Sequence, residues 1–428
     1  MNRLPHYFTA STEAIDHQFN GVLKAALVSK VSQLKSLKEP ANGELLDEMA
    51  ATIKQHTGIS LTVRLFKGMG AVVELPALTA SNPIVNQWRK GPWMSKKGVD
   101  LINAADKPLD GTIDLRKGKV DGVFTEVKQT LGIGDQLLRH PTVTFSSEEI
   151  VAIILHEVGH VFTYFEMMTR QASANYIIRG TVEQLSEAKD RKDKIRILKD
   201  TQDRTGVDLG DIDELADIAD RRAVAVTLYK KQDDYTRSEL GFSAYDTVGA
   251  ESRADQFAAR HGLALELVTG LDRIARVTGN PAHLSTMTMV GIKLVLWGSL
   301  VGASLLSPIG VGVLTGFGIL KVFFTLFEVE EYDELPQRFK RIRHQLIDGL
   351  KQPGISDSQR TSTVADIKQI DAIVNNLSEH TSMMAFVFNH LIPSRRRADR
   401  SKSFQQDIET MLANDLYLKA TELEQFKL

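Results

Sequence analysis

The spacing of apolar side chains separates a helical part of the chain from a strand-rich part. Residues 11–57 repeat apolar positions every three or four residues, which predicts helices. Residues 59–66 then alternate apolar and polar side chains, residues 67–70 form a glycine-rich turn signal, and residues 71–75 are again largely apolar. This pattern predicts a β-hairpin, and residues 111–124 suggest a second one. We therefore expect a small antiparallel sheet.

The most regular helical pattern begins at Ser146. Ser146 and Glu149 have the spacing of a capping box, in which each side chain accepts a hydrogen bond from the other residue's backbone N–H. The apolar residues that follow at helical spacing are Ile150, Ile153, Ile154, Val161 and Tyr164. We expect a helix with a buried apolar face directly after the sheet.

Residues 170–240 are dense in charged side chains of both signs. Within them, residues 183–194 form a highly charged helical stretch and residues 211–222 open another helix. We interpret this region as an inserted helical hairpin with a solvated surface. Ion binding or nucleic-acid binding by the same charges is the alternative interpretation.

A second unusual stretch is almost free of charge. Between residues 284 and 327 only Lys293 and Lys321 are charged, and Pro308 lies near the middle. Two helical arms on either side of this proline would each be about 30 Å long, which matches the hydrocarbon thickness of a bilayer. The stretch therefore predicts either a membrane-anchoring hairpin or a helical hairpin buried inside a soluble protein.

Composition narrows the chemistry that the chain can perform. Lys and Arg number 52 against 54 Asp and Glu, for a net charge of −2, so we expect no nucleic acid as a main partner. The chain has no cysteine, which excludes disulfides, thiolate metal sites and cysteine nucleophiles. Its first thirty residues lack a continuous apolar segment, so no signal peptide is expected.

The predicted helix at residue 146 carries a metal-binding pattern. His156 and His160 are four residues apart and project from the same side of a helix, where they can hold one Zn²⁺. Glu157 lies beside them and can act as a general base, as in the HExxH motif of metallopeptidases. The alternative interpretation is a core helix with two satisfied histidines.

A catalytic zinc normally has three protein ligands, so a third one is needed. Residues 250–262 form a helical segment that ends at a natural stop, Gly262, and Glu251 and Asp255 share one face of it. We predict Glu251 as the third ligand. Asp255 is expected to accept the free ring N–H of a ligating histidine. An ion-paired surface helix is the alternative interpretation.

The two motifs together resemble those of the gluzincin-type zinc metallopeptidases of the CaaX prenyl protease and HtpX group. The resemblance covers roughly residues 110–165 and 245–262. It implies an endopeptidase with one zinc ion per chain, held by His156, His160 and Glu251, and with Glu157 as the general base.

A weaker match concerns residues 332–338. Members of the group often carry a segment that contains His and Pro and ends in Arg, and here Tyr332 stands where the histidine would be. The resemblance implies that Tyr332 donates a hydrogen bond to a developing oxyanion, and that Arg338 orients Tyr332 or the metal face. Ordinary loop residues are the alternative interpretation.

The expected fold is α+β and mainly helical, with a zincin-like core. Residues 1–57 are an N-terminal helical segment, and residues 58–283 are the metallopeptidase core with a charged helical insertion at about 170–240. The apolar hairpin at 284–327 and a helical region at 328–428 follow.

The predicted function is zinc-dependent hydrolysis of peptide bonds in a protein or peptide substrate. An edge strand of the small sheet would pair with an extended substrate, or the sheet would only cover the helix. We expect a cytoplasmic protein, or one in contact with a membrane through residues 284–327 whose catalytic core lies on the cytoplasmic side. The alternative is a non-catalytic structural or membrane-active assembly component that retains a peptidase-like core.

Overall fold

A computed structural model describes residues 21–37, 43–76, 81–91, 95–115, 117–240, 247–278, 335–351 and 354–389. The predicted apolar hairpin at 284–327 and Tyr332 lie outside these residues. The described part is mainly helical with a small sheet, as predicted. Its helices are α1 (Val22–Ser36), α2 (Gly43–Thr57), α3 (Pro83–Lys90), α5 (Gly98–Ala104), η1 (Gly122–Glu126), α6 (Asp135–Leu138), α7 (Ser147–Glu187), α8 (Arg191–Thr205), α9 (Ile212–Asp217), α10 (Arg221–Leu240), α11 (Thr247–Arg260), α12 (Ala264–Thr278), α15 (Leu335–Leu350) and α16 (Asp357–Asn389).

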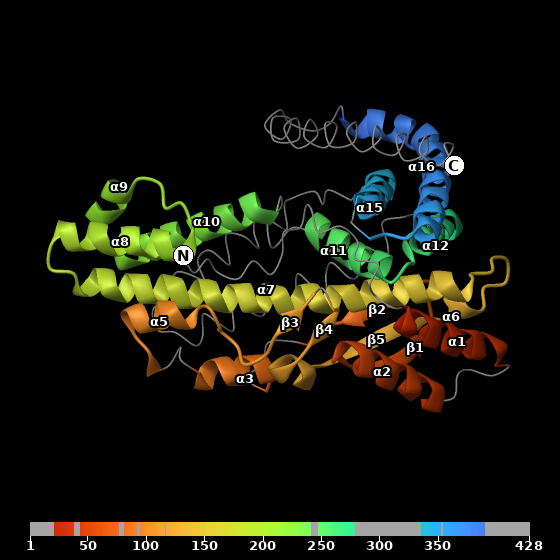
Figure 1. The fold of residues 1–428 in the computed structure, drawn as a ribbon, viewed down its shortest axis with the longest axis horizontal. Helices are drawn as coiled ribbons and strands as arrows, with labels where there is room; N and C mark the ends of the chain where they lie inside the picture. The colour runs from red at the N-terminus through yellow and green to blue at the C-terminus, as the bar shows by residue number, and fades with distance from the viewer. Residues whose placement is uncertain are drawn as a thin grey trace.

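Helix α7 is the element on which the other layers pack (Figure 1). It has 41 residues, which makes it about 60 Å long. The predicted capping box is present at its start: the Ser146 Oγ accepts from Glu149 N at 3.0 Å, and Ser146 N donates to Glu149 Oε2 at 2.7 Å. Within the described ranges, α7 is the one helix long and apolar enough to cross a membrane. Its apolar window is entirely buried in the protein, as in the core helix of a soluble protein.

The main sheet differs from the predicted hairpin. Its strands are β1 (Ser60–Phe66), β2 (Ala71–Glu74) and β5 (Lys128–Gly134), in the order β1–β5–β2. β5 runs parallel to β1 and antiparallel to β2, so the sheet is mixed and the prediction of an antiparallel hairpin between β1 and β2 is wrong. A second pair, β3 (Ile113–Asp114) and β4 (Lys119–Val120), is antiparallel as predicted, but each strand has two residues.

The connection between β1 and β2 explains the inserted strand. Residues 67–70 do not close a tight turn between β1 and β2, because their backbone carbonyls bind the end of β5. Gly134 N donates to Gly70 O at 2.7 Å, and Gln136 N donates to Gly68 O at 3.1 Å. A Cβ at Gly134 would lie 2.4 Å from Gly68 O, so glycine is required for this approach. We predicted no strand at residues 128–134, and their insertion leaves β2 at an edge of the described sheet.

The described residues contain two separate clusters of buried apolar side chains. The larger group includes residues of the N-terminal helices, the sheet, α7, α11, α12, α15 and α16. The smaller one joins the last turns of α7 to α8, α9 and α10 and includes Val182, Leu198 and Leu228. Residues 188–240 therefore form a helical lobe with a core of its own at one end of α7 (Figure 1).

Helix α11 lies unusually close to α7. A Cβ at Gly159 would lie 2.7 Å from Ala254 Cα and 3.0 Å from Ala254 O. Real Cβ atoms do not approach backbone so closely, so only glycine allows this packing. α11 ends before Gly262, whose φ of 68° is the left-handed conformation that stops a helix. The close contact brings the acidic residues of α11 to the histidines of α7.

Candidate metal centre

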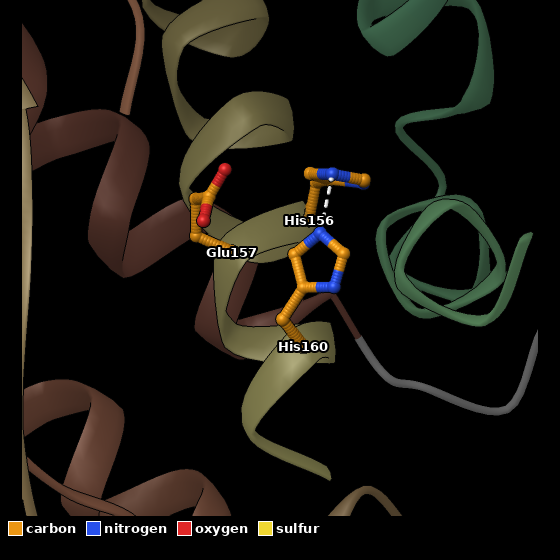
Figure 2. A group of neighbouring side chains, drawn as sticks. All are labelled: His156, Glu157 and His160. Carbon is orange, nitrogen blue, oxygen red and sulfur yellow. Dashed lines mark hydrogen bonds between the residues drawn. The ribbon is translucent and has the colours of Figure 1, made fainter. Parts of the chain in front are cut away.

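The two histidines of α7 face one another on the same side of the helix. The Nε2 atoms of His156 and His160 are 3.0 Å apart, and their rings are nearly perpendicular. Figure 2 shows Glu157 on a neighbouring side of the same turn. All three side chains are buried, and one ligand atom from each lies within 4.8 Å of the others. This buried group can hold a metal ion.

The carboxylate of Glu251, on α11, lies next to both histidines. Its Oε2 lies 3.4 Å from His156 Nε2, and its Oε1 lies 3.5 Å from His160 Nε2. Ligands held about 2.0–2.1 Å from a tetrahedral Zn²⁺ are about 3.3 Å from one another. The separations of 3.0 Å between the two imidazole nitrogens and of 3.4 and 3.5 Å from them to the two oxygens of Glu251 are close to this value.

The hydrogen-bond pattern also fits a bound cation. Within the described part of the chain, no hydrogen bond satisfies Glu251 Oε1, although this atom is buried. A buried carboxylate oxygen without a partner is costly, and a cation beside it would remove that cost. The donor set of two imidazoles and one carboxylate is typical of zinc centres.

Asp255 contacts one of the predicted ligands, His156. Its Oδ1 lies 2.9 Å from His156 Nδ1, which places the ring proton on Nδ1 and leaves Nε2 as the ligand atom. Both residues are buried, so water does not compete for this contact.

Arg338 forms ion pairs with the two carboxylates of α11, Glu251 and Asp255. Its Nε donates to Asp255 Oδ2 at 2.8 Å, its Nη2 donates to Asp255 Oδ1 at 2.5 Å, and its Nη1 is 2.9 Å from Glu251 Oε2. The guanidinium therefore binds the two acidic side chains and balances their charge. Arg338 comes from α15, so three helices distant in sequence build the centre.

Glu157 faces the sheet. Its Oε2 accepts a hydrogen bond from Val73 N at 3.0 Å, and Val73 belongs to the edge strand β2. Burial disfavours the charged carboxylate and raises the pKa of Glu157 to about 7. Sequence reasoning gave no signal for the contact with Val73, because it depends on where β2 lies relative to α7.

The histidines differ in protonation. Burial and the nearby Arg338 disfavour the cationic form of His156. Hydrogen bonds to Asp255 and Glu251 outweigh these effects and raise the pKa of His156 to about 9. For His160, burial lowers the pKa to about 3, so this ring is neutral.

The two carboxylates of α11 are ionised. Burial works against their charge, but Arg338 and the histidines hold the pKa of Glu251 well below its ordinary value. Arg338 and His156 do the same for Asp255. Both side chains are therefore anionic at neutral pH. Arg338 and His156 occupy both oxygens of Asp255, so Glu251 is the carboxylate of this pair that can face a cation.

A second buried ion pair, which sequence reasoning missed, joins the same two helices. Glu166 Oε2 of α7 and Arg253 Nη1 of α11 are 2.5 Å apart. The signal for Glu166 is that it is the one charged residue within 161–168, a stretch that is otherwise apolar apart from Thr163. Arg253 stands among other charged residues of its segment, so the sequence gives no comparable signal for it.

Comparison of the chain with protein-family models, with curated proteins and with solved structures found no match.

Proposed function

We propose that this protein is a zinc-dependent endopeptidase with a zincin-like core. The observation that carries the proposal is the position of Glu251, which lies 3.4 and 3.5 Å from the ring nitrogens of His156 and His160. A carboxylate at this place on a second helix turns a pair of histidines into a three-ligand set. Glu157 then occupies the side of the centre that faces the edge strand.

Each residue has a distinct task in the proposed reaction. His156, His160 and Glu251 would hold one zinc ion, which supplies Lewis acidity when bound. Glu157 accepts a proton from the attacking water and later donates it to the leaving amine. Because Val73 N–H holds its Oε2, its Oε1 is the atom that takes the proton.

The edge strand supports a peptide as the substrate. β2 pairs with β5 on one side, and on its other side the backbone N–H of Val73 points to the centre. An extended peptide could pair with the main-chain groups of this edge other than Val73 N, which Glu157 occupies. The peptide would then lie beside Glu157. A cytoplasmic location and membrane contact through residues 284–327 remain predictions from the sequence.

Glu157→Gln tests the proposed chemistry. We expect the variant to bind zinc as the wild type does and to lose cleavage of an unfolded protein substrate by about 10²–10⁴-fold, because the amide cannot accept the proton. Glu187→Gln, at the exposed end of the same helix, is the matched control and should cleave normally. A chelator should abolish wild-type cleavage, and added zinc should restore it. Wild-type rates in Glu157→Gln would refute the proposal.

The burial of the centre supports a second candidate function. His156, Glu157 and His160 are at most 5% exposed, which is unusual for a site that must admit a peptide. A non-catalytic assembly component with a structural metal ion would have such a closed centre. Stoichiometric zinc without cleavage of any protein substrate would favour this function.

A further inference from the structure

The ion pair between Glu166 and Arg253 is almost completely removed from water. Glu166 is 1% exposed and Arg253 is 7% exposed. Glu166 Oε2 contacts Arg253 Nη1 at 2.5 Å, and its other oxygen accepts from Arg170 Nε at 2.9 Å. A buried charge pair of this kind is a weak source of stability, because desolvation offsets the attraction. A role in fixing a specific arrangement is therefore the better explanation of its presence.

The pair is placed where it can set the position of α11. Arg253 stands between Glu251 and Asp255 in the sequence, and Glu166 follows His156 by ten residues, about 15 Å along α7. The contact of Gly159 with Ala254 provides another fixed point on the same two helices. The helices are thus joined at the histidines, at the glycine and at the ion pair.

Small residues alone do not fix the register of two helices. The Gly159–Ala254 contact allows close approach, but apolar surfaces can slide and rotate with little change in buried area. A buried ion pair is directional, and a sliding α11 would leave the Glu166 and Arg253 charges uncompensated. A metal centre needs its ligands within about 0.5 Å of the right place, so an external restraint on α11 matters to Glu251.

We propose that Glu166 and Arg253 are positioning residues that hold Glu251 within ligand distance of the two histidines. The inference rests on the metal centre of the proposed function but not on peptidase activity. Removal of the pair is expected to weaken zinc binding by about 10- to 100-fold, as for other residues that orient metal ligands from outside the coordination sphere.

Zinc affinity of the full chain, measured by competition with a chromogenic chelator, tests the proposal. Glu166→Gln leaves Arg253 uncompensated and can fail to fold, so the deciding variant is Glu166→Met combined with Arg253→Leu, which replaces the pair by apolar side chains. Glu183→Gln, which breaks the Arg179–Glu183 pair further along α7, is the matched control and should bind zinc as the wild type does.

A second measurement separates positioning from general damage to the fold. If the pair acts through Glu251, the double substitution should not weaken zinc binding further when Glu251→Gln is already present. The visible spectrum of the Co²⁺-loaded double variant should also resemble that of Glu251→Gln rather than that of the wild type. A folded double variant with wild-type zinc affinity and an unchanged spectrum would overturn the proposal.

The outcomes distinguish this inference from the proposed function. If the wild-type chain binds zinc but cleaves no substrate, the proposed peptidase function is refuted. The zinc affinity of the double variant then decides the inference by itself. If the wild-type chain cleaves its substrate and the double variant keeps the wild-type zinc affinity, only the inference is refuted. A wild-type chain that binds no zinc removes both.

Discussion

At the scale of single residues, His156 is the most constrained member of the centre. Its Nδ1 lies 2.9 Å from Asp255, while its Nε2 faces Glu251 and His160. Both ring nitrogens therefore have acceptors nearby, which is why the pKa of His156 is raised to about 9 despite burial. The ring is cationic at neutral pH when no metal ion competes for it.

Zinc affinity should depend on pH through His156. A ligand imidazole must be neutral, so zinc binding releases the proton that His156 holds below its pKa of about 9. Zinc affinity should rise about tenfold for each pH unit between about pH 7 and pH 9 and should then level off. Chelator competition at several pH values measures the slope. Asp255→Asn removes a negative charge that raises the pKa of His156, so the variant should show a smaller rise in zinc affinity over this pH range. A flat wild-type profile would contradict His156 as a ligand that must lose a proton.

Glu157 depends on a backbone group of another element. Val73→Pro removes the N–H that holds Glu157 Oε2, and an edge strand tolerates proline where that N–H points out of the sheet. We expect unchanged zinc affinity and a kcat lowered by about 10- to 100-fold, because the base is no longer oriented. Val73→Ala keeps the N–H and controls for the lost side chain. Equal kcat values for the two variants would show that the hydrogen bond has no role.

At the scale of elements, the packing of α11 on α7 decides whether the centre exists. Gly159→Ala places a methyl group 2.7 Å from the Ala254 backbone, so α11 must move away. We expect a loss of about 1–3 kcal/mol in stability and weaker zinc binding. The measurements are thermal unfolding and chelator competition.

Gly180→Ala is the control for this substitution. Gly180 is also on α7, but its close neighbour is not α11: a Cβ at Gly180 would lie 2.6 Å from Gly98 O. It should destabilise the protein to a similar degree and leave zinc affinity unchanged. Equal losses of affinity in the two variants would mean that the effect is not specific to the α7–α11 contact.

The sheet shows where local pattern fails. The strands predicted at residues 59–66 and 71–75 are present as Ser60–Phe66 and Ala71–Glu74, but the prediction that they pair directly is wrong. β5 enters between them because its glycines allow close approach, and Gly134 contacts the backbone of residues 68–70. The identity of each strand is a local property, whereas the partner of a strand depends on residues more than fifty positions away.

At the scale of the whole molecule, the lobe of residues 188–240 has a buried cluster separate from the one around the centre. Leu198→Ala in the lobe should therefore lower stability by about 2–5 kcal/mol and leave zinc affinity within about twofold of wild type. Leu155→Ala, equally buried beside His156, should lower both. Thermal unfolding and chelator competition measure the two effects. A loss of zinc affinity in Leu198→Ala would show that the lobe and the centre are coupled.

Local sequence patterns are enough to predict the start of α7, the pair of histidines beside Glu157, and the candidates Glu251 and Asp255. These depend on capping and on spacing within one helix, which are short-range properties. Only the tertiary structure decided that Glu251 lies within 3.5 Å of both histidines, that Arg338 binds the acidic residues of α11, and that Val73 holds Glu157. It also revealed the Glu166–Arg253 pair. These contacts join residues 83 to 95 positions apart, and they follow from how whole helices and strands pack, which no local pattern encodes.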